Sequence, residues 1–169
     1  MLQAKDLLEH ASRLLIPKSK EVDWRRAVSA SYYAVFHLLT GAVASQVSPV
    51  IPVGLQGRTR RVLEHRAMKT AMRPFLSKGS FHQYSNALHV PCAFSDDLRE
   101  LSEAFGELQD ARHLADYDVA DLQGTVDLSW ATDCVDKARR VFAAWDRAKS
   151  SEAATLFLAA MIFDAKWAK

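Results

Sequence analysis

Residues 23–47 read DWRRAVSASYYAVFHLLTGAVASQV, and this stretch decides the fold class. Its apolar residues recur every three or four positions, the spacing that places side chains on one side of a helix. Two adjacent rows follow this spacing: Ala27, Ala30, Ala34 and Leu38, and Val28, Val35 and Leu39. The pattern predicts a long helix that begins near Asp23 as its N-cap and is buried over much of its surface.

Four other segments have helical periodicity, and none alternates with the period of two that indicates a strand. Residues 48–57 contain two prolines and two glycines and predict a loop, and residues 77–94 predict a loop with at most one short helical turn. The first of the four segments covers 2–15 and ends before Pro17, and the second runs from 58 to about 72, where Pro74 ends or bends it. The third begins with Ser95 as its cap and runs to about Tyr117. The fourth begins with Ser129 as its cap and extends as far as Ala165, with a break near 149–151. We therefore expect an all-α fold, an up-and-down bundle of four or five helices forming a single domain over residues 1–169.

Composition fits a globular protein, with 25% charged residues and a net charge of +2. Cys92 and Cys134 lie far apart, which predicts neither a disulfide framework nor a zinc knuckle and favours a reducing compartment. No signal peptide is visible, and the longest apolar stretch, 155–163, is far shorter than the roughly 20 residues of a membrane span. We expect a cytoplasmic protein with no membrane segment.

Charge is unevenly distributed along the chain. Residues 58–78 contain seven basic residues and one acid, whereas residues 95–121 contain nine acids and two bases. Four side chains in the basic segment repeat every four positions, as neighbours along one edge of a helix do: Arg61, His65, Lys69 and Arg73. Such a row suits phosphate binding, and it suits a solvated helix surface equally well.

The segment ARHLADYD, residues 111–118, carries side chains suited to chemistry on phosphates. Arg112 and Asp116 are helix neighbours, and so are His113 and Tyr117. A guanidinium can hold a phosphate through two N–H donors, and an imidazole can move a proton at neutral pH. The alternative is that Arg112 and Asp116 form only a surface ion pair. Asp116 and Asp118 have no clustered partners at ligand spacing, so we expect no metal and no cofactor.

On the 23–47 helix, Arg26, Tyr33 and His37 share one face. Aromatic residues on an alanine-rich helix can also be core residues, an interpretation that applies to Tyr32, Tyr33 and Phe36. In the same way, His37 can be a core or interface histidine.

Taken together, the two segments RRAVSASYYAVFH (25–37) and ARHLADYD (111–118) resemble the paired motifs AxxYYAxFH and RxxADYD of compact bacterial and archaeal HEPN proteins. The residues around His65 resemble the family's middle helix, and residues 127–141 resemble its last helix. The resemblance covers about residues 2–145 and leaves 146–169 as a C-terminal helical extension. It implies a helical bundle, commonly a homodimer, that associates with RNA or nucleotides.

The resemblance also implies site residues, with one departure from the family's nucleases. Those enzymes carry Arg-x(4–6)-His with a polar residue after the arginine; Arg112 and His113 match the first half, but Tyr117 stands where the histidine is expected. His113 would have to replace that histidine, although it projects about 100° around the helix from Arg112. His37 or His65 could also supply an imidazole from another helix. The implied sets are Arg112, His113 and Tyr117 for catalysis; Arg112, Arg61, His65 and Lys69 for phosphate or RNA; and Tyr33, His37, Asp116 and Asp118 in support.

Two functions of different classes remain open on this evidence. The first is an RNA- or nucleotide-associated protein of a toxin–antitoxin or defence system, with a weak or degenerate metal-independent ribonuclease site. The second is a non-catalytic interaction or dimerisation module that works with a nucleotidyltransferase or antitoxin partner. Whether the protein is an enzyme is left open, because Tyr117 disfavours cleavage whereas Arg112 and His113 favour it.

Overall fold

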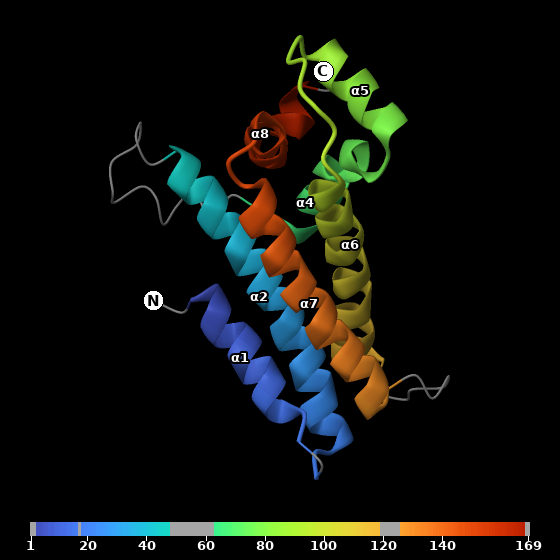
Figure 1. The fold of residues 1–169 in the computed structure, drawn as a ribbon. Coiled ribbons are helices and arrows are strands. Elements are labelled where there is room, and N and C mark those ends of the chain that lie inside the picture. Colours follow the sequence, from blue (N-terminus) through green and yellow to red (C-terminus); the bar gives the residue numbers. More distant parts are fainter. Residues whose placement is uncertain (1–2, 17, 48–62, 119–125, 168–169) are drawn as a thin grey trace. The chain divides into compact units, whose positions relative to one another are not determined.

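The structure, a computed structural model, describes residues 3–16, 18–47, 63–118 and 126–167. All regular structure in these ranges is helical, which confirms the all-α prediction (Figure 1). The elements are α1 (Ala4–Leu14), α2 (Glu21–Val47), α4 (His65–Ala71), the 3-10 helix η1 (Arg73–Leu76), α5 (Lys78–Ala87), α6 (Asp96–Tyr117), α7 (Leu128–Ala148) and α8 (Glu152–Trp167).

The helices are distributed over two compact units, and α2, α6 and α7 each contribute to both. Unit 1 comprises residues 1–38 and 104–142, and unit 2 comprises residues 39–103 and 143–169. Unit 1 therefore holds α1, the first part of α2, the last part of α6 and the first part of α7. Unit 2 holds the remaining parts of these helices together with α4, η1, α5 and α8.

Unit 1 is an up-and-down arrangement of four helical segments (Figure 1). Arg25, near the start of α2, contacts the backbone at the end of α6, so these two helices run antiparallel. Where α1 meets α2 and α7, small buried residues form a cluster against which Leu8, Leu14 and Leu15 pack: Ala11, Ala27, Ala30 and Val135. The alanine spacing seen in the sequence allows this close approach of helices.

Tyr32 lies at the centre of unit 1. Its side chain is completely buried, with ring centroids of Phe105 and Phe36 at 5.6 and 6.3 Å. Burial raises the pKa of Tyr32, because the ionised phenol would lose its hydration. Tyr32 is thus a core aromatic, whereas Tyr33 and Phe36 are only half-buried.

Unit 2 contains a ten-residue helix, α5, where the sequence predicted a loop with at most one short turn. That prediction was wrong because KGSFHQYSNA is mostly polar and contains Gly79, so its periodicity is weak. The helix is stabilised by its Ser77 cap and by Phe81, which is completely buried against Phe75 and Phe94. Tertiary packing, rather than intrinsic propensity, supplies most of the stability of such a helix.

Several predicted helix boundaries were displaced. The helix predicted from Asp23 begins at Glu21, and the Asp23 carboxylate accepts a hydrogen bond from the Lys20 N–H (2.9 Å). The last bundle helix is capped by Asp127 rather than Ser129, because the Asp127 carboxylate accepts the Trp130 N–H (2.7 Å). At α7 a neighbouring residue with equal capping ability therefore satisfies a free N–H group of the first turn, whereas at α2 Asp23 lies inside the first turn and bonds back to the residue before the helix.

Other boundaries agree with the sequence. The Ser95 hydroxyl caps α6, accepting the Leu98 N–H at 3.3 Å, and the predicted break near 149–151 separates α7 from α8. The helix predicted over 58–72 is described only from His65 to Ala71, and Glu64 before it has an extended backbone. Pro74 lies in η1, which ends the helix as expected. The predicted loop at 48–57 and the start of that helix lie outside the described residues.

His89 follows α5 with a φ of 54°, in the left-handed region that favours glycine. The Val90 N–H bonds the Ser85 carbonyl at 2.9 Å, so the turn closes the helix end. We expect His89→Gly to raise the free energy of unfolding by about 0.5–1 kcal/mol, because it removes the steric cost of this conformation. Urea unfolding followed by circular dichroism measures the change. His82→Gly, within the exposed face of α5, is the control and should lower stability by about 1 kcal/mol; a loss in both variants would contradict the strain at His89.

By length and composition, one described helix could cross a membrane. Its window within Glu21–Gln46 has a mean hydropathy of 1.3, and 61% of that window is buried inside the structure. Core helices of soluble proteins pass the same test. A signal sequence near an N-terminus passes it too, so the expectation of no membrane segment stays a prediction.

Candidate functional site

Two antiparallel helices of unit 1, α2 and α6, each contribute a pair of residues one turn apart. On α2 these are Ser29 and Tyr33, and on α6 they are Arg112 and Asp116. The Ser29 hydroxyl donates to one Asp116 oxygen at 2.5 Å, and the guanidinium of Arg112 lies over the Tyr33 ring at 5.4 Å from its centroid. Because the helices are antiparallel, one turn forward on α2 matches one turn back on α6, and both contacts form together.

Arg112 is held from three sides. Its Nε forms an ion pair with the second Asp116 oxygen at 2.6 Å, and its guanidinium carbon also lies 5.6 Å from the Tyr117 ring centroid. Two aromatic faces and a carboxylate restrict the side chain to one orientation. Neither terminal nitrogen of Arg112 forms a hydrogen bond to any residue in the described part of the chain, and the side chain is 21% exposed. The donors that would grip a planar or tetrahedral anion are thus left available.

The electrostatic balance around Arg112 keeps it charged. Desolvation by burial acts to lower the pKa of Arg112, but Tyr33, Asp116 and Tyr117 together outweigh it, and the pKa lies above its ordinary value. Asp116 neutralises one positive charge while it accepts the Ser29 hydrogen bond. A permanently charged, oriented guanidinium remains, which is the arrangement that recognises phosphate and carboxylate groups.

Tyr117 and His113 form an exposed aromatic pair at the end of α6. Their ring centroids lie 4.9 Å apart, and Tyr117 is 62% exposed. Beside them is a hollow of about 470 Å³ whose described lining comes entirely from α6 and the residue after it: Asp110, His113, Leu114, Tyr117 and Asp118. Its volume suits one small ligand.

The structure brings together part of the predicted site. Asp116, Tyr117 and Tyr33 each contact Arg112, whereas His113 contacts Tyr117 and lines the hollow. His37 lies one turn beyond Tyr33 on α2 and packs edge-on against Phe36 at 5.9 Å. Asp118 lines the hollow with Asp110. The predicted residues on α6 therefore belong to two adjoining features, an arginine clamp facing α2 and an aromatic hollow on α6.

The predicted basic row does not lie on one helix. His65 and Lys69 are on α4 in unit 2, but α4 ends at Ala71, so Arg73 belongs to η1. The intervening turn breaks the four-residue spacing that the prediction assumed. Arg61 lies outside the described residues. His65 and Lys69 thus belong to a different unit from Arg112.

Sequence reasoning missed two residues that support the site. Ser29 precedes Tyr33 by one turn on the same face, and that spacing was a usable signal. Arg25 donates from Nη1 to the carbonyls of Leu114, Ala115 and Asp118 at 3.3, 3.1 and 2.8 Å, and its Nε pairs with Glu21 at 2.7 Å. A cation at the C-terminal end of a helix satisfies carbonyls that have no helical partner. No sequence signal identified this contact, because it joins positions about 90 residues apart.

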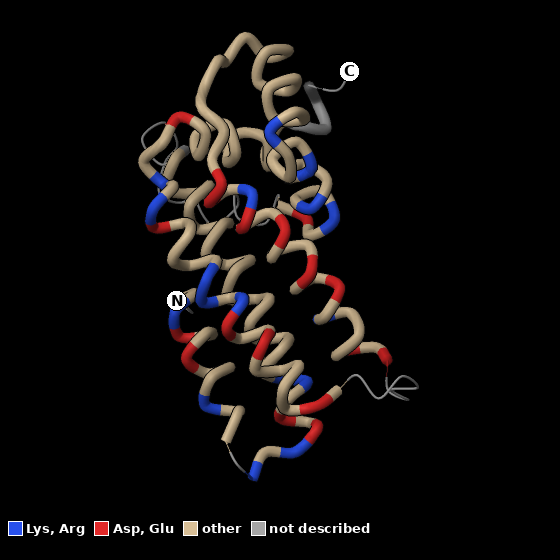
Figure 2. Tube along the Cα trace, turned by 45° about the vertical axis from the view of Figure 1, so that its right-hand side comes forward, with Lys and Arg blue, Asp and Glu red and all other residues tan. Residues whose placement is uncertain are grey.

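Acidic side chains recur along α6, where Arg112 and Arg99 are the two basic residues (Figure 2). The acids are Asp96, Asp97, Glu100, Glu103, Glu107, Asp110 and Asp116. Within the described ranges, no three His, Cys, Asp or Glu side chains are grouped closely enough to hold a metal ion. Arg112, which Asp116 and two tyrosines orient, is the one Lys or Arg in the part of α6 that belongs to unit 1.

Evidence for the function comes from the site itself: an oriented guanidinium and, next to it, an exposed aromatic pair beside a small hollow. Both features lie within unit 1. In comparisons with protein-family models, with curated proteins and with solved structures, nothing matches the chain.

Proposed function

We propose that the protein binds single-stranded RNA or nucleotides, with Arg112 holding a phosphate and Tyr117 stacking on a neighbouring base. The observation that carries this proposal is the orientation of Arg112 by Asp116, Tyr33 and Tyr117, which leaves its terminal donors without a partner among the described residues. A pre-oriented guanidinium loses little entropy when it grips a phosphate bidentately.

The exposed rings support a nucleic acid ligand over a simple anion. Tyr117 is 62% exposed and lies beside His113, and base stacking on an aromatic ring contributes about 1–3 kcal/mol per base. In the hollow next to them, the carboxylates of Asp110 and Asp118 could accept hydrogen bonds from amino groups of a base. A phosphate contact and a stacking contact less than two helical turns apart suit adjacent parts of one nucleotide chain.

The same geometry supports the resemblance to HEPN proteins. Tyr33 comes from the first resembling segment and Arg112 and Asp116 from the second, and the two segments are in contact although they lie far apart in sequence. We propose a degenerate relative of the HEPN ribonucleases, with weak or no cleavage. Tyr117 stands in the position of their histidine, and a phenol is a poor proton acceptor at neutral pH.

The test compares wild type with Arg112→Ala in fluorescence anisotropy titrations of a labelled, mixed-sequence single-stranded RNA, in the presence of EDTA. We expect the substitution to weaken binding about tenfold, which corresponds to about 1.4 kcal/mol for one charge-assisted contact. Arg99→Ala, which removes the same charge from the other end of α6, is the matched control and should change affinity by less than about twofold. Gel analysis of the same mixtures should show little or no cleavage.

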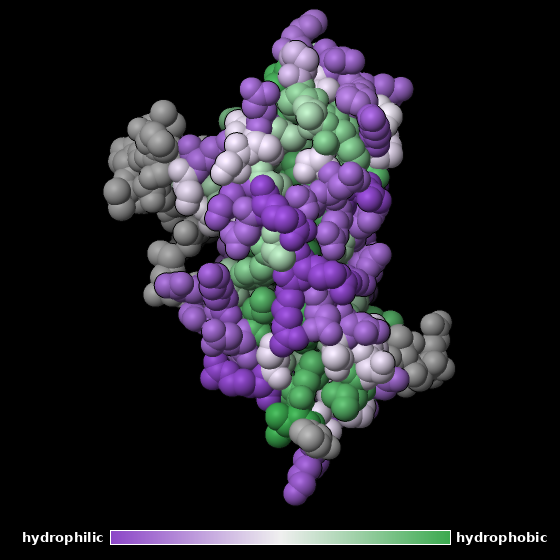
Figure 3. Space-filling view, viewed as in Figure 1, coloured by the Kyte–Doolittle hydropathy of each residue, from purple (hydrophilic) through white to green (hydrophobic). Residues whose placement is uncertain are grey.

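Two results would contradict the proposal. Strong wild-type cleavage that Arg112→Ala leaves unchanged would place the chemistry elsewhere. Absence of binding by the wild type would favour the second candidate, a non-catalytic module for dimerisation or for a nucleotidyltransferase or antitoxin partner. Two exposed apolar side chains support that candidate: Ile16, just after α1, and Val22, at the start of α2. Figure 3 shows hydrophobic atoms in this region, at the lower end of the view.

We also propose a cytoplasmic location. A single-stranded RNA ligand is most available there, and the burial of most of the apolar window of α2 supports its role as a core helix.

A further inference from the structure

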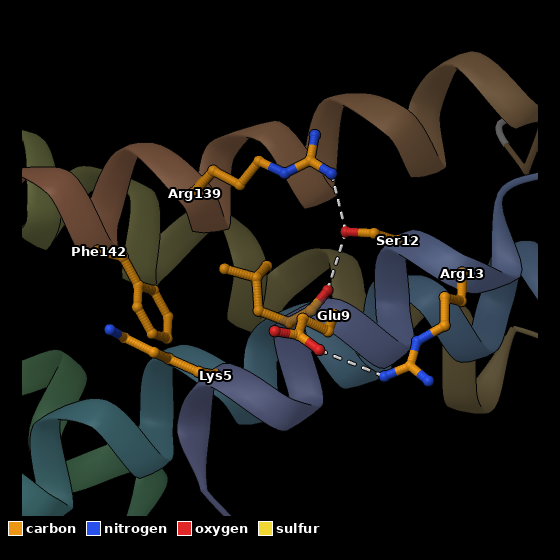
Figure 4. A pocket seen from close by; sticks show the side chains of 7 residues that line it. Lys5, Glu9, Ser12, Arg13, Arg139 and Phe142 are labelled. Carbon is orange, nitrogen blue, oxygen red and sulfur yellow. Dashed lines mark hydrogen bonds and ion pairs between the residues drawn. The ribbon is translucent and has the colours of Figure 1, made fainter.

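A second concave site lies in unit 1 between α1 and α7, apart from the residues of the proposed RNA site. It has a volume of about 570 Å³ and is lined by residues of both helices: Lys5, Leu8, Glu9, Ser12, Arg13, Arg139 and Phe142 (Figure 4). This volume is within the range of small-molecule sites. None of its lining residues takes part in the contacts of Arg112.

The rim of this α1–α7 groove is positively charged. Its lining holds three cations and one carboxylate, and a second carboxylate, Asp136, pairs with Arg139 from outside the lining, which leaves an excess of one positive charge. The ion pair between Arg13 and Glu9 is long, 3.4 Å, and its side chains are 73% and 70% exposed. Such exposed pairs contribute little to stability and are easily exchanged for another partner. Lys5 forms no ion pair or hydrogen bond with any other described residue.

Arg139 is the ordered cation of the groove. Its Nη1 pairs with Asp136 at 2.6 Å, and its Nη2 donates to the Ser12 hydroxyl at 2.8 Å. Ser12 in turn donates to the Leu8 carbonyl at 2.9 Å, so the guanidinium is tied to α1 across the groove (Figure 4). A ligand oxygen can replace Ser12 as acceptor, because the hydroxyl keeps its own bond to the helix backbone.

The interior of the groove is apolar. Leu8 packs against the buried cluster of unit 1, and Phe142 is half-buried, with its ring directed toward Lys5 in Figure 4. In the space-filling view, hydrophobic atoms show between hydrophilic ones over α1 and α7 (Figure 3). A fully polar anion would gain no binding free energy from contact with Leu8 and Phe142. A neutral hydrocarbon would gain none from the three cations.

We propose that the α1–α7 groove binds a small amphiphilic organic anion, an aliphatic or aromatic carboxylate or sulfonate in free solution. The acidic head group pairs with Arg139 and Lys5, and the apolar body covers Phe142 and Leu8. This assignment goes beyond RNA binding and does not depend on it, because no residue is shared between the two sites.

Binding is measured with anilinonaphthalene sulfonate, an aromatic sulfonate whose fluorescence rises in apolar surroundings, on the full chain. We expect saturable binding that octanoate displaces and that octylammonium and inorganic phosphate do not. Arg139→Gln and Phe142→Ala should each weaken binding about tenfold, the effect of losing one charge-assisted contact or one buried ring face. Circular dichroism checks that each variant is folded.

Arg140→Gln makes the same charge change one position along α7, outside the groove, and should alter binding by less than about twofold. Arg112→Ala should leave dye binding unchanged, and RNA should not displace the dye, which separates this proposal from the previous one. Equal dye affinity in wild type, Arg139→Gln and Phe142→Ala would overturn it. Displacement by octylammonium as well as octanoate, or binding of anionic lipid vesicles without binding of octanoate, would also overturn it.

Discussion

Replacing Phe75 with alanine is expected to lower the free energy of unfolding of the protein by about 3–5 kcal/mol. Phe75 is 1% exposed, and its ring is surrounded by three aromatic side chains of α5 and α8. The centroids of Phe81, Tyr84 and Phe157 lie 5.5, 6.1 and 4.9 Å away. Removing the ring leaves a cavity that these large side chains cannot fill without moving their helices.

Urea unfolding followed by far-ultraviolet circular dichroism measures the loss. Phe163→Ala, on α8 with a side chain 40% exposed, is the matched control and should cost less than about 1.5 kcal/mol. Phe75→Leu keeps part of the volume and should fall between the two. If Phe75→Ala cost no more than the control, the aromatic cluster would not be the stabilising core of unit 2.

The second large effect is expected at the junction of α2 and α6. Arg25→Met should lower the free energy of unfolding by about 2 kcal/mol, because the end of α6 loses its charged donor. Arg25 is 16% exposed and bonds three carbonyls through one nitrogen, but its other terminal nitrogen is buried without a hydrogen bond among the described residues. Methionine removes that unsatisfied donor and keeps much of the apolar volume. The net loss of stability is therefore smaller than the summed contributions of the hydrogen bonds that are removed.

Arg26→Met is the control for this prediction. Arg26 is the next residue, is exposed, and forms no hydrogen bond or ion pair with other described residues, so its substitution should change stability by less than about 0.5 kcal/mol. Amide hydrogen exchange at the end of α6 should accelerate in Arg25→Met alone. Equal losses of stability in both variants would indicate a general charge effect rather than a cap.

The site was predictable where neighbours on one helix carry it. Arg112 with Asp116, and His113 with Tyr117, follow from four-residue spacing, and both pairs are in contact. The residues of α2 that contact Arg112 and Asp116 were harder to predict from spacing alone. Tyr33 was named as a supporting residue, but whether it served the core or the site was open, since both uses require an aromatic residue on the same helix.

Helix class and order followed from the sequence by itself, because hydrophobic periodicity, capping residues and prolines act over a few neighbouring positions. The long α2, the start of α6 at Ser95 and the break between α7 and α8 are of this kind. Only the tertiary structure decided that α5 is helical, that Arg25 caps α6, and that Lys5 and Arg139 share a groove. Each of these depends on residues far apart in sequence, whose contact is selected by packing and by unsatisfied polar groups of the whole chain rather than by local spacing.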